Sequence, residues 1–451
     1  MTKPFIPPHP PRGPGPVAVW RGFVGERART AVYGWSERAF DTDYMRRKVL
    51  GYTVHIPIAP RLVQQVLLDN AANYAKPKIV KSLLAPVIGR GLLTSDGELW
   101  REQRKIVAAS FAPAAVDGLV PVFARAAEAT MESWRAGGLI DAQAQATATT
   151  MRIIADSLFA GDPRLTSPAA MAHIAAALEA FSEARVQALL GLPVIPLSLK
   201  ALKGRRGQIY LRETLTKVVR DRQPGGSGDD FLGKLIRALH ERFESAEAEA
   251  LAIDNAATFY LAGHETTANA ITWTLFCLSE QPALQDQAAD EATAALASGP
   301  ANAALPDRLP LLRRILEESL RLYPPAPRLD RQAVAGDTLG EANVRPGDIV
   351  SVWPWLIHRS RKLWHDPDAF DVDRFLPDQK KNLHRFQYIP FGGGPRTCVG
   401  ARFATAEALT ILALWLRGWR FSPATDREVR VSGMVTLRPK GGMPLFLHPR
   451  S

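Results

Sequence analysis

The most constraining feature of this 451-residue sequence is a long helical segment, 246–280, whose middle part is apolar on nearly all sides. A helix that faces water keeps polar residues on that face, whereas a helix that is apolar all round must be covered by protein. The segment therefore predicts a helix at the centre of a large protein.

The rest of the chain divides into a long helical part and a smaller part rich in strands. From about 62 to 323 the pattern is helical, and 399–419 returns to it, whereas 326–357 and 429–449 are richer in Val, Pro and Gly. An alternating run at 50–62 predicts a short strand pair, and PGGSG at 224–228 predicts a loop. The predicted fold class is mainly α with a smaller β-rich portion.

The N-terminus differs in composition from everything that follows. Residues 1–16 contain seven prolines, which predict an extended tail that is poorly ordered or laid on the surface. The sequence contains no internal repeat and no second glycine-rich nucleotide fingerprint. We expect a proline-rich tail over 1–25 and one catalytic domain over 26–451.

The charge and hydropathy patterns limit the partners and the compartment. The net charge of +11 comes from Lys and Arg spread along the whole chain, without a zinc-finger or RNA-binding signature, so nucleic acid is not an expected partner. Prolines occupy the N-terminus where a signal peptide needs an apolar helix, and no uninterrupted apolar run reaches about 18 residues. We expect a cytoplasmic monomer without a transmembrane anchor.

The two cysteines, Cys277 and Cys398, stand in very different surroundings, and two are too few for a disulfide framework. Cys277 lies in the apolar run TLFCL and is expected to be a small buried side chain. Cys398 lies in FGGGPRTCVG (391–400), just before a helix. Glycines let a backbone curl over sulfur, a helix N-terminus favours a thiolate, and a nearby arginine suits a cofactor carboxylate.

The 391–400 loop resembles the haem-binding loop of the cytochrome P450 family at every defining position, and the resemblance covers the chain from about Leu50 onwards. It implies the cytochrome P450 fold, with haem b held between the long central helix and the cysteine loop. Cys398 would be the axial ligand of the iron, with Phe391, Arg396 and Gly400 beside the cofactor. The competing interpretation is a buried cysteine after an ordinary glycine-rich turn.

The central helix carries the run AGHETT at 262–267. A glycine inside a helix costs about 1 kcal/mol relative to alanine, and a threonine can bond back to the preceding turn, so we expect a local opening for a small ligand and waters. The run resembles the family's oxygen-activation motif, which implies that Gly263 lies at the cofactor, Thr266 orients water and dioxygen, and Glu265 relays protons. His264 lacks the partners of a zinc site and is expected to face neighbouring structure.

Two further motifs support the resemblance. Glu318 and Arg321 are three residues apart on one helix face and precede the run LYPP; they resemble the family's structural Glu–Arg pair, which Arg374 would complete. Val372 stands where the family usually has a proline, so the path of that loop stays open. Haem has two propionates, and the residues that resemble their family partners are Trp100, Arg104, Arg396 and Arg331.

The resemblance implies a monooxygenase that inserts one atom of dioxygen into an apolar organic substrate by hydroxylation or epoxidation. The chain has no flavin or iron–sulfur segment, so a ferredoxin or flavodoxin with its reductase, supplied by NAD(P)H, is the implied electron donor. Arg101, Lys105 and Arg402 are candidates for docking that acidic partner. A peroxide-driven peroxygenase, an electron-independent isomerase or dehydratase, and a non-catalytic haem-binding sensor or carrier are the alternatives.

The substrate is the least determined property. We expect an apolar pocket lined near 83–88, 259–262, 327–329 and 434–437. Fatty acids, terpenoids, steroids and aromatic compounds all stay open, although AGHETT and LRLYPP are more similar to the fatty-acid and eukaryotic-like branch than to the camphor-type branch. The apolar and then basic segment 186–206 is either an entrance that touches lipid or an ordinary surface loop.

Overall fold

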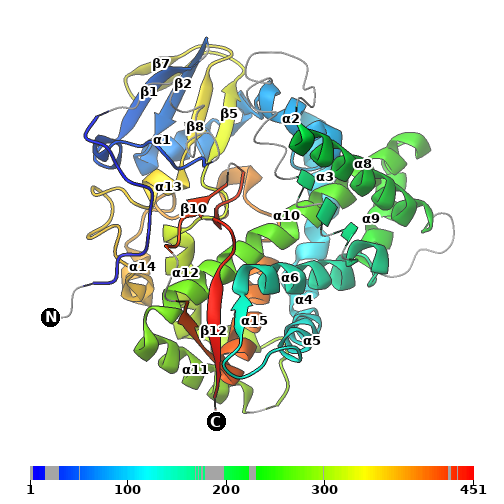
Figure 1. Ribbon diagram of the computed structural model, residues 1–451. Coiled ribbons are helices and arrows are strands. Elements are labelled where there is room, and N and C mark those ends of the chain that lie inside the picture. The colour runs from blue at the N-terminus through cyan, green and yellow to red at the C-terminus, as the bar shows by residue number, and fades with distance from the viewer. Residues whose placement is uncertain are drawn as a thin grey trace.

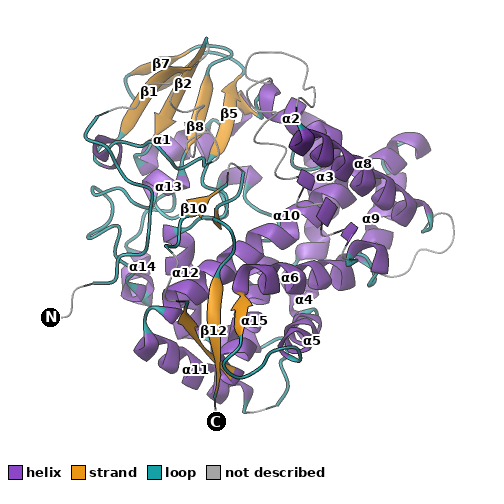
Figure 2. Cartoon of the chain, viewed as in Figure 1, coloured by secondary structure: helices purple, strands orange, loops and turns teal. Residues whose placement is uncertain are grey.

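The computed structural model describes residues 4–15, 30–49, 51–167, 169–170, 172–173, 176–177, 198–222, 230–297, 299–424, 428–433 and 435–450. The fold is mainly α with smaller sheets, as the sequence predicts (Figure 2). The described helices are α1 (Pro60–Gln64), α2 (Lys78–Ile88), α3 (Gly97–Ala108), α4 (Pro113–Asp117), α5 (Val120–Met131), α6 (Ala142–Leu158), α8 (Leu199–Arg220), α9 (Phe231–His240), α10 (Ser245–Ser279), α11 (Pro282–Leu296), α12 (Pro310–Leu322), α13 (Pro354–Ile357), α14 (Pro377–Lys381) and α15 (Ala401–Gly418).

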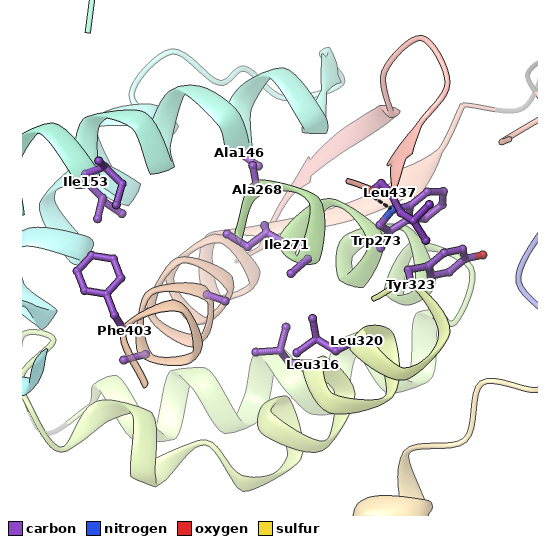
Figure 3. Packing of buried hydrophobic residues seen from close by; sticks show 14 of the residues in the cluster. Ala146, Ile153, Ala268, Ile271, Trp273, Leu316, Leu320, Tyr323, Phe403 and Leu437 are labelled. Atoms are coloured by element: carbon purple, nitrogen blue, oxygen red, sulfur yellow. Dashed lines mark hydrogen bonds between the residues drawn. The ribbon is translucent and has the colours of Figure 1, made fainter. Parts of the chain in front are cut away.

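Helix α10 runs through the middle of the molecule, and its bounds differ by one residue from the predicted ones at each end (Figure 1). All residues from Thr267 to Ser279 are buried, because α6, α8, α9, α12 and α15 pack around the helix. Figure 3 shows Ala268 of α10 facing Ala146 of α6, with Leu316 of α12 on the other side. The apolar surface that extends around this segment is therefore covered by helices, as predicted.

The strands form one larger sheet and three small ones. The described strands are β1 (Tyr44–Val49), β2 (Tyr52–Pro57), β3 (Tyr74–Ala75), β4 (Leu139–Asp141), β5 (Leu329–Ala333), β6 (Asp337–Leu339), β7 (Ala342–Val344), β8 (Ile349–Val352), β9 (Trp419–Pro423), β10 (Val431–Ser432), β11 (Arg438–Pro439) and β12 (Pro444–Pro449). The five-stranded sheet has the order β1-β2-β8-β5-β3, in which only β2 and β8 are parallel.

The predicted strand pair at 50–62 is wrong in its bounds. That range holds one strand, β2, whose antiparallel partner β1 precedes it. Strand β1 has the sequence YMRRKV and no buried residue, so it lacks the apolar alternation by which strands are recognised. The end of the range begins α1 instead, because Pro60 occupies the first helical turn, where its fixed φ suits a helix.

Part of the proline-rich N-terminal segment lies against the body. The backbone N–H of Phe370 donates to the Phe5 carbonyl at 3.0 Å, and the Tyr323 hydroxyl donates to the Pro8 carbonyl at 2.7 Å. Both terminal nitrogens of Arg12 donate hydrogen bonds to the Asp368 carboxylate. These contacts hold residues 4–15 on the surface; residues 16–25 and the predicted loop at 224–228 lie outside the described residues.

A search for membrane-spanning helices covered the described part of the chain. No single helix there has the length and apolarity needed to cross a membrane, and only the bent pair Gly97–Phe111 and Pro113–Met131 reaches both together.

Candidate active site

The cysteine loop is shaped by two glycines with left-handed backbone conformations. Gly392 has a φ of 72° and Gly394 a φ of 68°, which L side chains rarely adopt. A Cβ atom on Gly394 would lie 1.7 Å from the carbonyl oxygen of Leu67, so this residue is also fixed by the close approach of the neighbouring chain. The loop closes where the Cys398 backbone N–H donates to the Phe391 carbonyl at 2.9 Å. Sequence and geometry thus fix the position of the sulfur.

Cys398 stands three residues before α15 and is an exposed residue. Protein surrounds the thiol closely, yet its surface remains exposed, whereas Cys277 is fully buried as predicted. Burial raises the pKa of the Cys398 thiol, while the backbone N–H of Gly400 and the charge of Arg104 oppose this shift. The protein therefore supplies partial support for a thiolate, and a bound cation would supply the remainder, because a coordinating thiol is deprotonated outright.

The central helix has one open stretch in its middle. Ala262 is exposed and Thr266 is partly exposed, although their neighbours from Thr267 onwards are buried. The Thr266 hydroxyl donates to the Ala262 carbonyl at 2.8 Å, the backward bond that the motif predicts. The structure explains why position 263 is a glycine, which the sequence did not reveal: a Cβ there would lie 2.4 Å from Cδ1 of Ile154. Close packing of α6 on α10 requires this glycine.

The two residues between Gly263 and Thr266 point to different partners. His264 is buried, its Nδ1 is 2.6 Å from the Tyr260 carbonyl oxygen, and burial lowers its pKa. It thus faces neighbouring structure, and the described residues contain no cluster of metal-ligating side chains. The Glu265 carboxylate accepts a hydrogen bond of 2.7 Å from the hydroxyl of Thr436.

Beside the cysteine loop, Trp100 of α3 and Arg396 lie together. The guanidinium carbon of Arg396 is 4.4 Å from the centre of the Trp100 ring. Nη2 of Arg396 donates to the Asp96 carboxylate and, at 2.8 Å, to the Ser95 carbonyl. Arg104 lies one turn further along α3; burial lowers its pKa, and the nearby Cys398 opposes this shift. Trp100 and Arg104 of α3 thus lie beside Arg396 and Cys398 of the cysteine loop.

Two further basic residues, Lys76 and Arg331, lie near Arg396 and add positive charge to this group. Burial, together with the charge of Arg396, lowers the pKa of Arg331 to about 10. Burial, together with the charges of Arg331 and Arg396, lowers the pKa of Lys76 to about 7. Asp96 already pairs with Arg396 and Lys81, and Asp330 pairs with Arg328. Among the described residues, neither Lys76 nor Arg331 has an ion pair of its own.

This arrangement fits a haem. Lys76 and Arg331 have no ion pair among the described residues, and Arg396 shares its partner Asp96 with Lys81. Two propionates would offset this charge, since a shielded charge without a partner is costly. The exposed sulfur of Cys398 is a soft ligand of the kind that iron in haem accepts. The donor set therefore suits a group that is anionic at one edge and carries iron at its centre.

The Glu–Arg pair is fully buried. Arg321 donates to both carboxylate oxygens of Glu318, at 2.6 and 2.7 Å. The Asp371 backbone N–H also donates to this carboxylate, and Nε of Arg374 lies 3.4 Å from it. Arg374 thus has the expected neighbour, and Val372 begins a short 3-10 helix, Val372–Phe375, where the family usually has proline.

His358 connects this cluster to the segment before the cysteine loop. Its Nδ1 is 3.1 Å from the Arg321 carbonyl oxygen, and its Nε2 accepts from the backbone N–H of Ile389 at 2.9 Å. Burial, followed by the charge of Arg321, lowers the pKa of His358 to about 3. The ring is therefore neutral, with its proton on Nδ1.

The predicted docking residues all have local acidic partners. Arg101 pairs with Glu98, Lys105 with Glu102, and Arg402 with Asp117. Each of the three basic side chains is still about half exposed or more.

The predicted pocket segments are only partly described. Residues 83–88 belong to α2, 259–262 to α10, and Pro327–Leu329 leads into β5. Met434 and residues 186–197 lie outside the described residues.

Sequence reasoning missed Lys76, His358 and Thr436, each of which lacks a motif. It also missed Glu407 of α15, a fully buried acid whose pKa burial raises well above its ordinary value, with a small opposing effect of Thr267. Only its position nine residues after Cys398, inside an apolar helical run, distinguished it.

Comparisons with known proteins agree with this geometry. Residues 14–446 match the sequence profile of the family described as Cytochrome P450. Cyclooctatin synthase of Streptomyces melanosporofaciens is 32% identical over 402 residues, which cover 88% of this chain and 86% of that protein. Pentalenene oxygenase of Streptomyces avermitilis is 26% identical over 434 residues, 94% of each chain.

Solved structures show the same fold. The haem domain of cytochrome P450DA superposes with a TM-score of 0.83 at 22% identity and covers 98% of both chains. The retinoic-acid-bound cyanobacterial CYP120A1 gives a TM-score of 0.79 at 22% identity, covering 90% of this chain and 92% of that one. The profile match, the 32% identical relative and the shared fold lead to one conclusion: the chain belongs to the cytochrome P450 family of monooxygenases.

Proposed function

We propose that this monooxygenase hydroxylates or epoxidises a terpenoid, with electrons from a separate ferredoxin or flavodoxin that NAD(P)H reduces through a reductase. The observation that carries the proposal is Cys398, an exposed cysteine just before α15 in a loop that its backbone N–H closes onto the Phe391 carbonyl. The terpenoid class is supported by two relatives whose names are those of terpenoid-oxidising enzymes, cyclooctatin synthase and pentalenene oxygenase.

Haem b would be held by residues from five parts of the chain. Cys398 would be the axial ligand. The ring would lie against Phe391, Gly400 and the open stretch of α10 at Gly263. The cations around the propionates would be Lys76, Arg104, Arg331 and Arg396, with Trp100 beneath Arg396. When bound, the haem receives electrons and activates dioxygen, and thiolate ligation favours O–O cleavage.

The chain's own residues would supply protons and orientation. Hydroxylation converts a C–H group, dioxygen, two electrons and two protons into an alcohol and water. The Thr266 hydroxyl donates its hydrogen to the Ala262 carbonyl, so its oxygen can accept a hydrogen bond from a water molecule in the open stretch. Glu265 would bring protons to that water from outside. The buried cluster around Glu318, Arg321 and Arg374 would act structurally, by fixing the base of the cysteine loop.

The expected substrate surroundings are apolar. The described segments provide Leu83 and Leu84 of α2, Ala262 of α10, Leu329 of β5 and Val435 after β10. A hydrocarbon gains about 25 cal/mol for each Å² that it removes from water, whereas a polar substrate would need partners that these side chains lack. This composition supports a terpenoid hydrocarbon over a polar substrate.

The redox partner would dock on the basic surface near α3 and the start of α15. Arg101, Lys105 and Arg402 keep much of their surface exposed although each has an acidic neighbour. Exposed pairs contribute little to stability, so an acidic partner can compete for these cations at low cost. Charge reversal to Glu at the three positions should raise the apparent KM for ferredoxin without changing haem content, and an unchanged KM would exclude this surface.

The function is tested with haem-loaded protein, a plant-type [2Fe–2S] ferredoxin, ferredoxin reductase, NADPH and a panel of terpene hydrocarbons, fatty acids and steroids. We expect a spin-state shift of the haem with terpenes and oxygenated products that incorporate one atom from labelled dioxygen. Product formation with hydrogen peroxide at an equal or higher rate would indicate a peroxygenase. A second protein ligand on the iron and no product from any compound would indicate a sensor or carrier.

A further inference from the structure

The acid of the central motif is held by a residue far away in the sequence. The Thr436 hydroxyl donates to Oε1 of Glu265 at 2.7 Å, across 171 residues of sequence. Both side chains are partly buried, and a hydrogen bond to a carboxylate is shorter and stronger than one between neutral groups. The bond connects α10 to the turn between β10 and β11, which is next to the predicted substrate surroundings.

The turn that carries Thr436 is fixed on both sides. Gly433 has a φ of 112°, and a Cβ there would lie 1.8 Å from the Thr436 carbonyl oxygen. On the other side, the Leu437 backbone N–H donates to the Pro325 carbonyl at 3.0 Å, and its carbonyl accepts from Nε1 of Trp273 (Figure 3). Leu437 itself is completely buried. The residues on either side of Thr436 are therefore held by close backbone contacts at Gly433 and at Leu437.

Glu265 needs such support, because its neighbours on α10 do not provide it. Consecutive residues of a helix point in different directions, so the carboxylate does not share the direction of the Thr266 hydroxyl. A glutamate side chain on its own loses considerable rotamer freedom when it is ordered. The other titratable group at this place, His264, is buried and bonded to the Tyr260 carbonyl, although its charge interacts with that of Glu265.

We propose that Thr436 is the positioning residue for Glu265: its hydroxyl holds the carboxylate in the one orientation from which Glu265 supplies protons toward Thr266. This inference rests on the proposed monooxygenase function. It assigns a role in proton delivery to Thr436, which belongs to a segment expected from the sequence to line the substrate pocket. Substrate oxidation would then depend on an intact turn even where the substrate does not touch Thr436.

Two variants separate the hydroxyl from the shape of the side chain. Thr436→Val keeps the volume and removes the hydroxyl, whereas Thr436→Ser keeps the hydroxyl. Ser432→Ala is the matched control, because it removes a hydroxyl from the same hairpin at a position that pairs with Arg438 through the backbone and whose side chain forms no hydrogen bond among the described residues. Glu265→Gln identifies the infrared band of the Glu265 carboxylate and measures how far hydrogen peroxide release depends on this acid.

The first measurement needs no turnover. The infrared carboxylate band of Glu265, assigned as the difference between the wild type and Glu265→Gln, is recorded in the apoprotein and in the haem-loaded protein. We expect Thr436→Val to shift the band in both forms, and Thr436→Ser and Ser432→Ala to leave it in place. An unshifted band in Thr436→Val would overturn the proposal, because the hydroxyl would then not hold the carboxylate.

The second measurement is hydrogen peroxide released per NADPH consumed in the ferredoxin system, with pentalenene as the probe. Hydroxylation and hydrogen peroxide release each consume two electrons and two protons, so protons delivered in the wrong position, rather than fewer protons, divert electrons from product to hydrogen peroxide. Thr436→Val should therefore raise this ratio about threefold or more, and Thr436→Ser should not. The double variant with Glu265→Gln should match Glu265→Gln alone, because both act on one group. Additive effects would contradict positioning through Glu265. If Glu265→Gln leaves the ratio of hydrogen peroxide to NADPH unchanged, Glu265 does not supply protons and Thr436 has no positioning role in catalysis. A shifted infrared band in Thr436→Val would then show only that the hydrogen bond exists.

Discussion

Arg321 and Glu318 form a fully buried ion pair in which two N–H groups of the guanidinium bind the two carboxylate oxygens. The other three N–H groups of Arg321 donate to the carbonyls of His358, Pro367 and Ala369. All five donors are thus satisfied without water. A buried charge of this kind is tolerated only while its partner is present.

Replacing Arg321 by Met should therefore destabilise the protein strongly. The change leaves the Glu318 carboxylate buried and without its main partner, which costs about 3–5 kcal/mol. Arg314→Met removes the exposed pair with Asp373 and should cost less than about 1 kcal/mol. Urea unfolding of both variants measures the two losses. Equally small decreases in the free energy of unfolding in both variants would mean that the buried pair does not stabilise the folded state.

His358 predicts how stability depends on pH. Burial and the charges of Arg321 and Arg359 lower its pKa to about 3 in the folded protein, against about 6.5 in an unfolded chain. The folded state therefore binds fewer protons, so this contribution is fully present above about pH 6.5 and is lost as the pH falls toward 3. From this one group, the free energy of unfolding changes by at most about 1.4 kcal/mol per pH unit.

The measurement is urea unfolding between pH 6.5 and 5. His264 and His9 also have lowered pKa values and contribute in the same direction, so the difference between the wild type and His358→Gln isolates His358. We expect a smaller slope in His358→Gln. The exposed His365 provides the control, and His365→Gln should keep the wild-type slope. The interpretation fails if the two variants show the same slope.

The parts of the site that the sequence predicts are those encoded by local spacing. The glycines before Cys398, the backward bond of Thr266 and the Glu318–Arg321 pair all depend on residues within about two helical turns. The central helix was predicted to within a residue at each end because its apolar surface extends all round. These features need no knowledge of which distant segments meet.

The parts that could not be predicted depend on distant segments. Lys76 reaches Arg331 because β3 pairs with β5, so that Ala75 lies opposite Gln332. Thr436 reaches Glu265 only because the C-terminal hairpin folds back onto α10. Gly263 is explained by Ile154 of α6 rather than by its own helix. In each case the partner is chosen by tertiary packing, for which the sequence around the residue carries no signal.

Gly394→Ala should prevent correct formation of the cysteine loop. An alanine would suffer left-handed strain of about 1–2 kcal/mol, and its Cβ would also collide with the Leu67 carbonyl. Gly347→Ala is the matched control, since Gly347 has a φ of 89° with open space around it. We expect much less haem in purified Gly394→Ala than in Gly347→Ala. Equal haem content would show that the close approach of Leu67 does not matter.

Lys76→Gln should weaken haem retention. The lysine adds positive charge beside Arg331 and Arg396, where propionates would bind, and its removal lowers the attraction for them. The neighbouring Lys78 is exposed, so Lys78→Gln controls for the loss of one net charge. The rate of haem transfer to excess apomyoglobin should rise about tenfold in Lys76→Gln only. The same rate in both variants would place the propionates elsewhere.

The central claim is that Cys398 supplies the iron ligand, and the carbon monoxide difference spectrum of reduced protein tests it most directly. We expect the wild type and Cys277→Ala to show an absorption band at about 450 nm, which thiolate ligation produces, and Cys398→Ser to lack it. Cys277 is the matched control because it is the second of the two cysteines and is buried in the core. Survival of the band in Cys398→Ser, or its loss in Cys277→Ala alone, would contradict the account.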